Sequence, residues 1–355
     1  MSIETAPEET PERRAYYERL APEGLAALWT RFPELVSREP KSPIRPHLWR
    51  YQAVRALLME AGGLITAKEA ERRVLILENP GLPGQSRVTR SLYAGLQLVL
   101  PGEVAPAHRH TQTALRFVME GEGAHTAVDG EKTIMRPGDF VITPNWAWHD
   151  HGNDSDRPMI WLDGLDIPLV QFLDASFAEG YGADEFPRGR PTGDNLARFG
   201  QGLLPVDWEA GETRTSPVFS YPYARSRETL ERLRAAEEWD ACHGIKLRYV
   251  NPATGGWAMP TMAACLQLLP KGGETEPYRS TDATVFTATE GRGRTIVGEP
   301  ILGETILDWG PRDVFVVPSW APVRHEALDD AVLFSFSDRP VQEALGLWRE
   351  DRGAA

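Results

Sequence analysis

The distribution of apolar residues changes character along the chain, and its first part has helical spacing. Between Pro11 and Gly62, apolar side chains recur at i, i+3 and i+4 in PERRAYYERLAPEGLAALWTRF and HLWRYQAVRALLMEAGG. This periodicity predicts amphipathic helices, and the pair Gly62 and Gly63 is typical of a helix stop. We therefore expect residues 1–70 to form an N-terminal helical segment.

Two later regions consist of short apolar and β-branched runs separated by Gly and Pro, as in β-strands. They extend from Arg72 to about Asp166 and from Met262 to Asp338, and each predicts an all-β barrel or sandwich. Asp129-Gly130 between two alternating runs predicts a tight hairpin, because both central residues of such a turn need positive φ. The expected boundaries are a first β domain at 71–170, a connector at 171–261 with one helix in SRETLERLRAAEEWD, a second β domain at 262–340 and a tail at 341–355.

The two β regions are a diverged internal repeat. ALRFVMEGEGAHTAV aligns with ATVFTATEGRGRTIV, and RPGDFVITPNWAWHDH aligns with GPRDVFVVPSWAPVRH. The repeated unit is a whole domain, far longer than the units of a solenoid, so the pattern indicates duplication. Two similar β domains are expected.

Composition and charge narrow the possible partners. The net charge is −13, and no basic stripe offsets it, which argues against nucleic acid. No run of about 18 apolar residues predicts a membrane span, and the acidic start MSIETAPEETPERR does not resemble a signal peptide. We expect a cytoplasmic protein without a membrane partner. Cys242 and Cys265 are expected to be buried thiols, and an anionic substrate would need local arginines.

Histidines are concentrated in the first β region. His108 and His110 are two residues apart, as are His149 and His151, so each pair shares one face of a strand. Two such pairs on neighbouring strands would bring four imidazoles near one point, which indicates a metal site. The remaining histidines have no partner nearby in the sequence, and we expect them to be structural or on the surface: His47, His125, His243 and His325.

The segments PGEVAPAHRH and GDFVITPNWAWHDHGN resemble the two cupin motifs. The resemblance implies a mainly β bicupin fold, with two antiparallel double-stranded β-helix (jelly-roll) barrels after the helical segment. Many cupins carry a glutamate four or five residues after the second His, but this chain has Ala114 and Leu115 there. The expected ligand set is therefore a neutral trio, His108, His110 and His149.

A neutral trio suits one chemistry in particular. Fe(II) held by three imidazoles keeps its full charge and three open coordination positions. It can then bind a bidentate anion and O₂ together, and an ortho-hydroxybenzoate is such a chelator. We expect one Fe(II) per chain and a small aromatic ortho-hydroxycarboxylate as the substrate.

The stretches HRHTQTALRFVMEGEG, AERRVLILENPGL and SLYAGLQL resemble the gentisate 1,2-dioxygenase group, which includes salicylate and 1-hydroxy-2-naphthoate dioxygenases. The resemblance implies an oxidoreductase that cleaves gentisate with both atoms of O₂ to maleylpyruvate, in aromatic compound catabolism, and it implies a homotetramer. Salicylate or 1-hydroxy-2-naphthoate cleavage is the alternative within the group. A non-enzymatic metal-binding bicupin is the more distant alternative.

Two arginines are candidates for holding the substrate carboxylate. Arg116 lies six residues after His110, and we expect strand alternation to turn it to the same inward face. An arginine at this place holds the substrate carboxylate in the family, although an ion pair with Asp163 is an alternative. Arg72 resembles a second carboxylate contact, but its neighbour Arg73 leaves the register open.

Further residues are expected to line the substrate site. His151 resembles the base that hydrogen-bonds the substrate, with a fourth metal ligand or a simply packed side chain as alternatives. Tyr93 and Gln97 share one face of SLYAGLQL and are expected in the pocket or in ordinary core. Asp163 is expected to orient His151.

The second β region lacks most of these groups. In the repeat alignment Tyr278 falls on His108, Ser280 on His110 and Phe286 on Arg116, and only His325 is kept, opposite His151. One histidine cannot hold a catalytic iron. We expect a barrel without metal that packs and oligomerises, with its interior filled by Phe286 and Tyr278.

Overall fold

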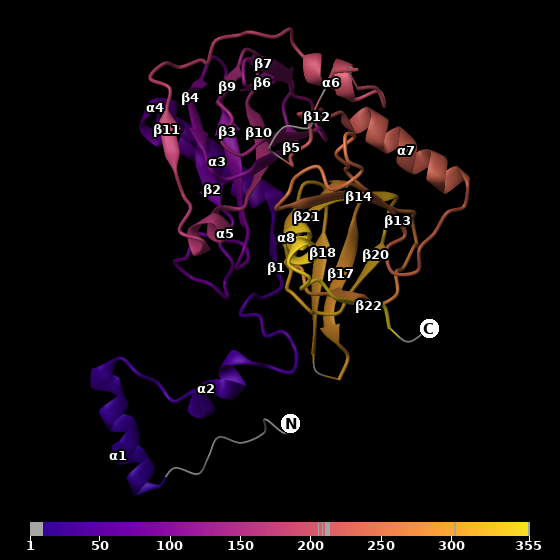
Figure 1. Cartoon of the computed structure of the whole chain (residues 1–355). Coiled ribbons are helices and arrows are strands. Elements are labelled where there is room, and N and C mark those ends of the chain that lie inside the picture. The colour runs from indigo at the N-terminus through magenta and orange to yellow at the C-terminus, as the bar shows by residue number, and fades with distance from the viewer. Residues whose placement is uncertain (1–9, 205, 208, 210–213, 302, 354–355) are drawn as a thin grey trace. The chain divides into compact units, whose positions relative to one another are not determined.

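The structure is a computed structural model that describes residues 10–204, 206–207, 209, 214–301 and 303–353. Contacts divide the chain into two units, Met1–Ser42 and Pro43–Ala355. The ribbon in Figure 1 labels their helices and strands. No helix among the described residues is long and apolar enough to cross a membrane.

The described part of the first unit is helical, as its periodicity predicts. α1 (Pro11–Leu20) begins after Thr10, whose Oγ1 accepts a hydrogen bond from the Arg13 amide at 3.3 Å. A side-chain oxygen at this position satisfies an amide that the first helical turn leaves free. A 3-10 turn (Ala21–Glu23) and α2 (Leu28–Leu35) follow.

The start of the second unit departs from the helical prediction. His47–Trp49 forms strand β1, which pairs with β19 (Val314–Val317) of the second barrel. The glycine stop was also wrong, because α3 (Tyr51–Leu64) passes through Gly62 and Gly63. A Cβ on Gly62 would lie 3.1 Å from Leu98 Cδ2, so this glycine allows the helix to approach β3 closely. α4 (Ala67–Ala70) ends the segment.

The first barrel consists of two antiparallel sheets. One has the order β12-β8-β5-β10-β3-β2 and the other β11-β4-β9-β6-β7. The predicted hairpin joins β6 and β7, with φ of 46° at Asp129 and 80° at Gly130. The strands of this barrel within the expected domain are β2 (Val74–Ile76), β3 (Tyr93–Val99), β4 (Val104–His110), β5 (Ala114–Glu120), β6 (Ala124–Val128), β7 (Glu131–Ile134), β8 (Phe140–Thr143), β9 (His149–Asn153) and β10 (Met159–Leu165).

The connector is more than a link between barrels. Its predicted helix is α7 (Tyr223–Ala235), and two shorter helices precede it, α5 (Ile167–Phe172) and α6 (Asp194–Phe199). It also contributes strands to both barrels: β11 (Ala178–Gly180) and β12 (Ser220–Tyr221) join the first, and β13 (Ile245–Arg248) joins the second. These strands complete sheets whose other members are distant in the sequence, which local patterns do not reveal.

The second barrel repeats the first. Its larger sheet has the order β1-β19-β16-β21-β14-β13, and β18-β17-β20 and β15-β22 form smaller sheets. The expected tail contributes β22 (Glu350–Asp351), which follows α8 (Arg339–Ala344). The other strands are β14 (Ala263–Leu269), β15 (Arg279–Ser280), β16 (Thr284–Glu290), β17 (Gly293–Glu299), β18 (Gly303–Trp309), β20 (Val323–Ala327) and β21 (Ala331–Ser337).

Strand register confirms the internal repeat. Arg116 pairs with Asp163 in the first barrel, and Phe286 pairs with Ser335 at the equivalent place in the second. His108 pairs with His149, and Tyr278 likewise pairs with Val323. The mainly β fold with two antiparallel barrels is therefore confirmed.

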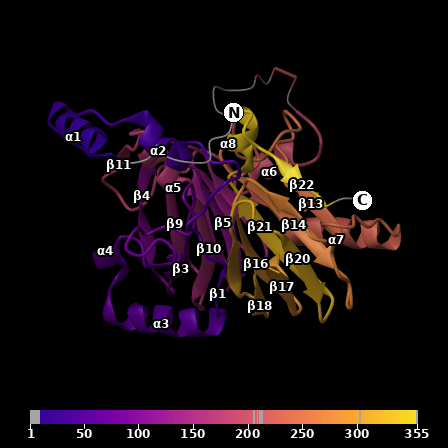
Figure 2. The ribbon, with the colours of Figure 1, turned by 90° about the horizontal axis from the view of Figure 1, so that it is seen from below.

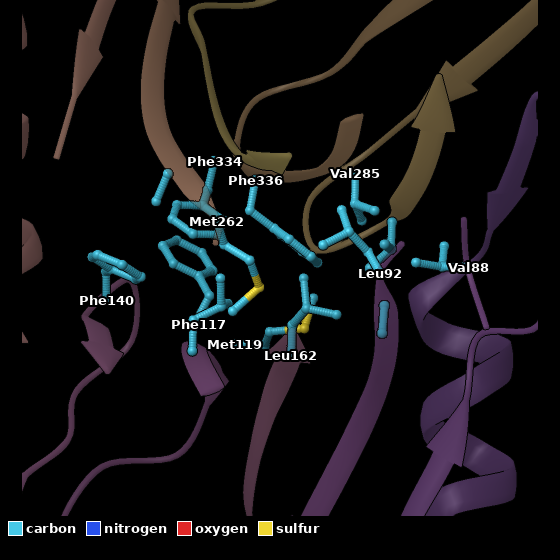
Figure 3. Close-up of a cluster of buried hydrophobic side chains, with 14 of the residues drawn as sticks. Val88, Leu92, Phe117, Met119, Phe140, Leu162, Met262, Val285, Phe334 and Phe336 are labelled. Carbon is cyan, nitrogen blue, oxygen red and sulfur yellow. The ribbon is translucent and has the colours of Figure 1, made fainter. Parts of the chain in front are cut away.

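The two barrels share a hydrophobic core between their larger sheets. In Figures 1 and 2 these sheets lie side by side, and Figure 3 shows side chains from both that meet between them. Phe117 of β5 stacks on Phe334 of β21 with 4.1 Å between ring centroids. Phe117 pairs with Leu162 across β5 and β10, next to the pair of Arg116 and Asp163. Neighbouring residues alternate in direction, so Phe117 and Leu162 point out of the barrel while Arg116 and Asp163 point in. The arginine is thereby left facing the interior of the first barrel.

Candidate metal centre and substrate site

Three histidines of the first barrel form a compact cluster. His108 and His110 end β4, and His149 begins β9 directly opposite His108 in the antiparallel register. One nitrogen from each ring lies within 4.8 Å of the others. The predicted trio is therefore brought together by the pairing of β4 with β9, and it is the one group of this kind found among the described residues.

Backbone carbonyls hold the rings of the trio in one orientation. The Nδ1 atoms of His110 and His149 lie 2.9 Å from the carbonyl oxygens of Gln112 and Ala147, and His108 Nδ1 lies 3.2 Å from that of Pro106. A carbonyl only accepts, so Nδ1 of His110 and Nδ1 of His149 carry the proton and their Nε2 atoms keep the lone pair. His149 Nε2 is buried without a hydrogen-bond partner. Such an orphaned lone pair fits a metal ion.

The cluster is held in its neutral form. Burial lowers the pKa of His108 to about 3, aided by the charge of Arg72, and burial lowers the pKa of His110 to about 4. The pKa of His149 also lies well below its usual value, mainly because of burial. Neutral imidazoles are the form that binds metal, because protonation would remove the lone pair.

His151 lies beside the trio with a different set of partners. Its Nδ1 is 2.9 Å from Thr126 Oγ1 and its Nε2 is 3.1 Å from an Nη of Arg116. A guanidinium only donates, so Nε2 is the acceptor and Nδ1 carries the proton towards Thr126. Burial and then the charge of Arg116 hold the pKa of His151 well below its usual value. The ring is thus a neutral acceptor.

Arg116 points into the barrel as expected, and only 4% of it is exposed. The reason differs from the expected one, because His110 ends β4 and Arg116 lies on β5 in the other sheet, so the two do not alternate along one strand. One Nη donates to Thr143 Oγ1 at 2.6 Å, the other faces His151, and Nε lies 3.8 Å from Asp163 Oδ1. The expected alternative, an ion pair with Asp163, is therefore present, although Arg116 Nε has no hydrogen bond. The guanidinium is held in the site with donor capacity to spare.

The structure separates the neighbouring arginines Arg72 and Arg73. Arg72 donates to the Pro106 carbonyl at 3.0 Å, and its guanidinium lies against the ring of His108. Arg73 turns the other way and forms a two-pronged ion pair with Glu103, at 2.7 and 2.8 Å. Arg72 is therefore the arginine that faces the site, as the resemblance implies.

Asp163 has other partners than the one expected. Its Oδ1 accepts a hydrogen bond from the Trp161 indole at 2.9 Å, whereas the ring of His151 is oriented by Thr126 and Arg116. Burial raises the pKa of Asp163 to about 6, against the opposing charge of Arg116. Asp163 therefore does not orient His151, as was expected, but lies next to Arg116 and pairs with its charge.

The wall beside Arg116 and Asp163 continues into β3 of the same sheet. Tyr93, Gly95 and Gln97 share a face of this strand, with Gly95 directly opposite Asp163. Burial and then the charge of Asp163 raise the pKa of Tyr93. A Cβ on Gly95 would lie 2.5 Å from Val74 Cγ1 and 3.0 Å from the Tyr93 hydroxyl. Glycine is therefore needed for the close packing of this wall.

Three functional neighbours were missed in the sequence: Thr126, Thr143 and Trp161. Thr126 pairs with His151 across β6 and β9, and Thr143 Oγ1 accepts from Arg116 at 2.6 Å. The hairpin signal at Asp129-Gly130 fixes the register of β6 with β7 but not with β9. Thr126 and Thr143 could be placed in the site only by knowing how strands distant in the sequence pair with one another.

The site carries a local positive charge within an acidic protein. Arg72 and Arg116 face it, and Asp163 is the carboxylate between them, as their mutual effects on pKa indicate. Burial, followed by the charge of Arg116, lowers the pKa of Arg72 to about 10, and burial also lowers the pKa of Arg116. A guanidinium keeps its proton in proteins, so both side chains count as cations. Two cations and one carboxylate leave one positive charge to attract an anion.

Comparison with known proteins gives one consistent family. Residues 95–165 match the cupin domain family. Gentisate 1,2 dioxygenase 1 of Aquipseudomonas alcaligenes is 59% identical over 99% of this chain and 100% of the relative. A gentisate 1,2-dioxygenase of a Streptomyces species is 39% identical over 93% of this chain and 92% of the relative.

Solved structures agree with these relatives. The salicylate 1,2-dioxygenase of Pseudoaminobacter salicylatoxidans, solved with gentisate, is 35% identical and has a TM-score of 0.91, covering 100% of this chain and 98% of that chain. This similarity over the whole chain agrees with the fold of two antiparallel barrels described above. The chain belongs to the gentisate 1,2-dioxygenase family of bicupin ring-cleaving dioxygenases.

Proposed function

We propose that this protein is an Fe(II)-dependent gentisate 1,2-dioxygenase, which adds both atoms of O₂ to gentisate and opens the ring to maleylpyruvate. The observation that carries the proposal is the position of Arg116, a buried cation that contacts His151 on the strand of His149. A purely structural metal site has no use for an inward arginine, and it favours a closed ligand shell. The 59% identical relative named for gentisate supports this choice of substrate.

The metal would be held by His108, His110 and His149. The orphaned Nε2 of His149 and the carbonyl-bound Nδ1 atoms fit an ion with imidazole ligands. Iron suits imidazole nitrogen, and three protein ligands leave open positions on it. When bound, Fe(II) would supply a Lewis acid that chelates the substrate and a centre at which O₂ reacts.

The arginines would bind and orient the substrate carboxylate. Arg116 offers a planar fork with spare donor capacity, and Arg72 places a second guanidinium against the ring of His108. Such forks match a carboxylate through parallel hydrogen bonds. Because the protein carries a net charge of −13, this local attraction is needed to bring an anion into the barrel.

His151 would take a hydrogen bond or a proton from a ring hydroxyl. Its Nε2 is an acceptor that currently faces Arg116, and Thr126 fixes the proton on Nδ1. When a substrate carboxylate engages Arg116, its negative charge offsets the effect that keeps His151 neutral. The imidazole can then accept a proton more readily from a substrate hydroxyl, which would become more acidic as the aromatic ring gives up electron density.

Oxygen consumption tests the proposal directly. Iron-loaded protein is mixed separately with gentisate, salicylate and 1-hydroxy-2-naphthoate, and oxygen uptake is followed together with the absorbance of the ring-opened product. We expect the highest kcat/KM with gentisate and one iron per chain. A higher kcat/KM with either other acid would assign that substrate, and no uptake with all three would favour a non-enzymatic bicupin. We further propose a homotetramer, which light scattering of the eluting protein would measure.

A further inference from the structure

The second barrel contains a cavity although its metal ligands are lost. The expectation that Phe286 and Tyr278 fill it was wrong, because a space of about 260 Å³ remains between their side chains and the barrel wall. Polar groups from four parts of the fold face this space. They include His243 and Lys246 of the connector, Cys265 of β14, Tyr278 and Ser280 in the place of the missing ligands, and His325 of β20.

Lys246 is a cation without a carboxylate partner in this cavity. Its Nζ lies 6.0 Å from the centroid of the Phe286 ring, and no carboxylate oxygen of the described residues forms an ion pair with it. The other cations of the lining are engaged: Arg339 pairs with Glu343 at 2.7 Å, and Arg248 lies over the ring of Trp257. Lys246 is therefore the cation that is available to a ligand.

The carboxylate of the lining does not neutralise Lys246. Asp282 faces the same cavity, but its Oδ1 accepts a hydrogen bond from the indole of Trp348 at 2.9 Å. Glu343 balances Arg339, so Lys246 and Arg248 against the carboxylate of Asp282 still give the lining a net positive charge. The cavity is thus suited to an anion, in contrast to the protein as a whole.

Neutral hydrogen-bonding groups lie beside the cation. Thr295 Oγ1 is 2.8 Å from His325 Nδ1, which leaves His325 Nε2 for the cavity. The ring of His243 stands edge-on to Tyr278, with 4.5 Å between centroids. Burial lowers the pKa of both histidines to about 3, and the charge of Lys246 contributes. Both imidazoles can therefore form hydrogen bonds with a ligand, but they add no charge to the cavity.

We propose that the second barrel binds a small aromatic monocarboxylate of one ring, with its carboxylate on Lys246 and its ring beside Phe286. The size fits, because an apolar cavity of about 150 Å³ in another protein holds benzene, and about 260 Å³ adds room for a carboxylate. One available ammonium matches a single negative charge better than a phosphate dianion. Metal is not the occupant, since the second barrel contributes no three-ligand group among the described residues.

The binding site can be located with a heavy-atom probe. Crystals of the iron-loaded protein are soaked in 4-bromobenzoate, and anomalous scattering locates the bromine. We expect a bromine position inside the second barrel, beside Phe286 and within reach of the Lys246 ammonium. Bromine in the first barrel alone, or in neither barrel, would overturn the proposal. Because the soak uses the unaltered protein, it does not depend on the folding of a variant.

Equilibrium dialysis tests the site in solution with benzoate as the probe. Lys246→Met keeps the length of the side chain but removes its charge, and Lys271→Met is the matched control on an exposed turn. Both are combined with Arg116→Ala, which weakens binding in the first barrel. We expect the Lys246 variant to bind benzoate at least roughly tenfold more weakly than the control, as for loss of a charge-assisted contact.

Equal affinity of the two variants would show that Lys246 does not hold the carboxylate and would contradict the proposal. A bromine site in the crystal without benzoate binding in dialysis would mean binding at crystal concentration only, and would contradict it as well. Ring cleavage is measured separately on Lys246→Met with Arg116 intact, and we expect its kcat with gentisate to remain that of the unaltered protein. The second site can therefore fail while the proposed activity stands, and the reverse also holds.

Discussion

Arg116 places an Nη 3.1 Å from Nε2 of His151, deep inside the first barrel. Because the guanidinium can only donate, this contact fixes which nitrogen of His151 bears the proton. Because of this contact, the ability of His151 Nε2 to accept another hydrogen bond depends on whether Arg116 is bound to a different partner. A substrate carboxylate that draws Arg116 away frees Nε2 for the substrate hydroxyl. Carboxylate binding and proton acceptance are thereby linked through one side chain.

Replacing Arg116 is expected to weaken substrate binding while leaving the metal in place. Arg116→Lys keeps the charge but loses the planar fork, so KM for gentisate should rise. Arg116→Ala should cost about 2–4 kcal/mol in kcat/KM, since it removes a desolvated charge pair. Steady-state oxygen uptake and metal analysis provide the measurements. Arg157→Ala, at a side chain that is 81% exposed, is the control, and unchanged kinetics of Arg116→Ala would assign the carboxylate to Arg72.

Removing a histidine of the trio is expected to remove iron and activity together. His149→Ala leaves two ligands, which are too few to retain a labile divalent ion. His325→Ala is the matched control, because this buried histidine of the second barrel lies outside the trio. Metal analysis after dialysis should find about one iron per chain in the control and almost none in the variant. Full iron in His149→Ala would refute the ligand assignment.

His151→Ala should separate metal binding from turnover. Its Nδ1 and Nε2 are engaged by Thr126 and Arg116, so its loss should leave the iron content unchanged. Turnover should fall by about 10²–10⁴-fold, the range for loss of a general base. Metal analysis and kcat on the same preparation check both parts. Loss of iron from this variant would show that His151 is a fourth ligand.

Arg73→Met should destabilise the protein without touching the site. Arg73 is 5% exposed and lies 2.7 Å from Glu103, and breaking such a buried pair costs about 3–5 kcal/mol. The midpoint of urea denaturation at pH 7 provides the measurement, with Arg157→Met as the exposed control. A midpoint equal to that of the control would show that the ion pair contributes nothing.

The same variant should show a defined pH dependence. Burial alone would raise the pKa of Glu103, but hydrogen bonds from Arg73 and the Leu100 amide, with the charge of Arg73, lower it. A lowered carboxylate pKa gives stability that is complete above the unfolded value, about 4.3 for Glu, and is lost as the pH falls below it. The difference in unfolding free energy between the unaltered protein and Arg73→Met should therefore be constant near neutrality and shrink in acid. A difference that stays constant in acid would show that Glu103 is not the responsible group.

Much of the site followed from periodicity and spacing. Residues two apart in a strand share a face, so His108 could be paired with His110 and His149 with His151 from the sequence alone. Alternation could not place Arg116, because the strand of His110 ends before β5 begins. The same rule could not choose between Arg72 and Arg73, because β2 begins only at Val74. The ion pair of Arg73 with Glu103 made that choice in the folded chain.

The boundaries of the barrels were less accessible. His47–Trp49 has a helical pattern around it but forms a strand, since it completes the sheet of a barrel whose other strands come more than 190 positions later, beginning at Ile245. The cavity of the second barrel was also missed, because a repeat alignment gives residue identity at each position and not the space left between side chains.

The sequence by itself determined the two β domains and the two histidine pairs, because strand alternation and repeat spacing are local properties of the chain. The resemblance to cupins selected His108, His110 and His149 from these pairs. Only the tertiary structure decided which partners these groups meet: His149 opposite His108, Thr126 and Arg116 on His151, and Asp163 beside Arg116 instead of on His151. Those contacts depend on the pairing of strands distant in the sequence and on how side chains fill the barrel, and neither is encoded in a local pattern.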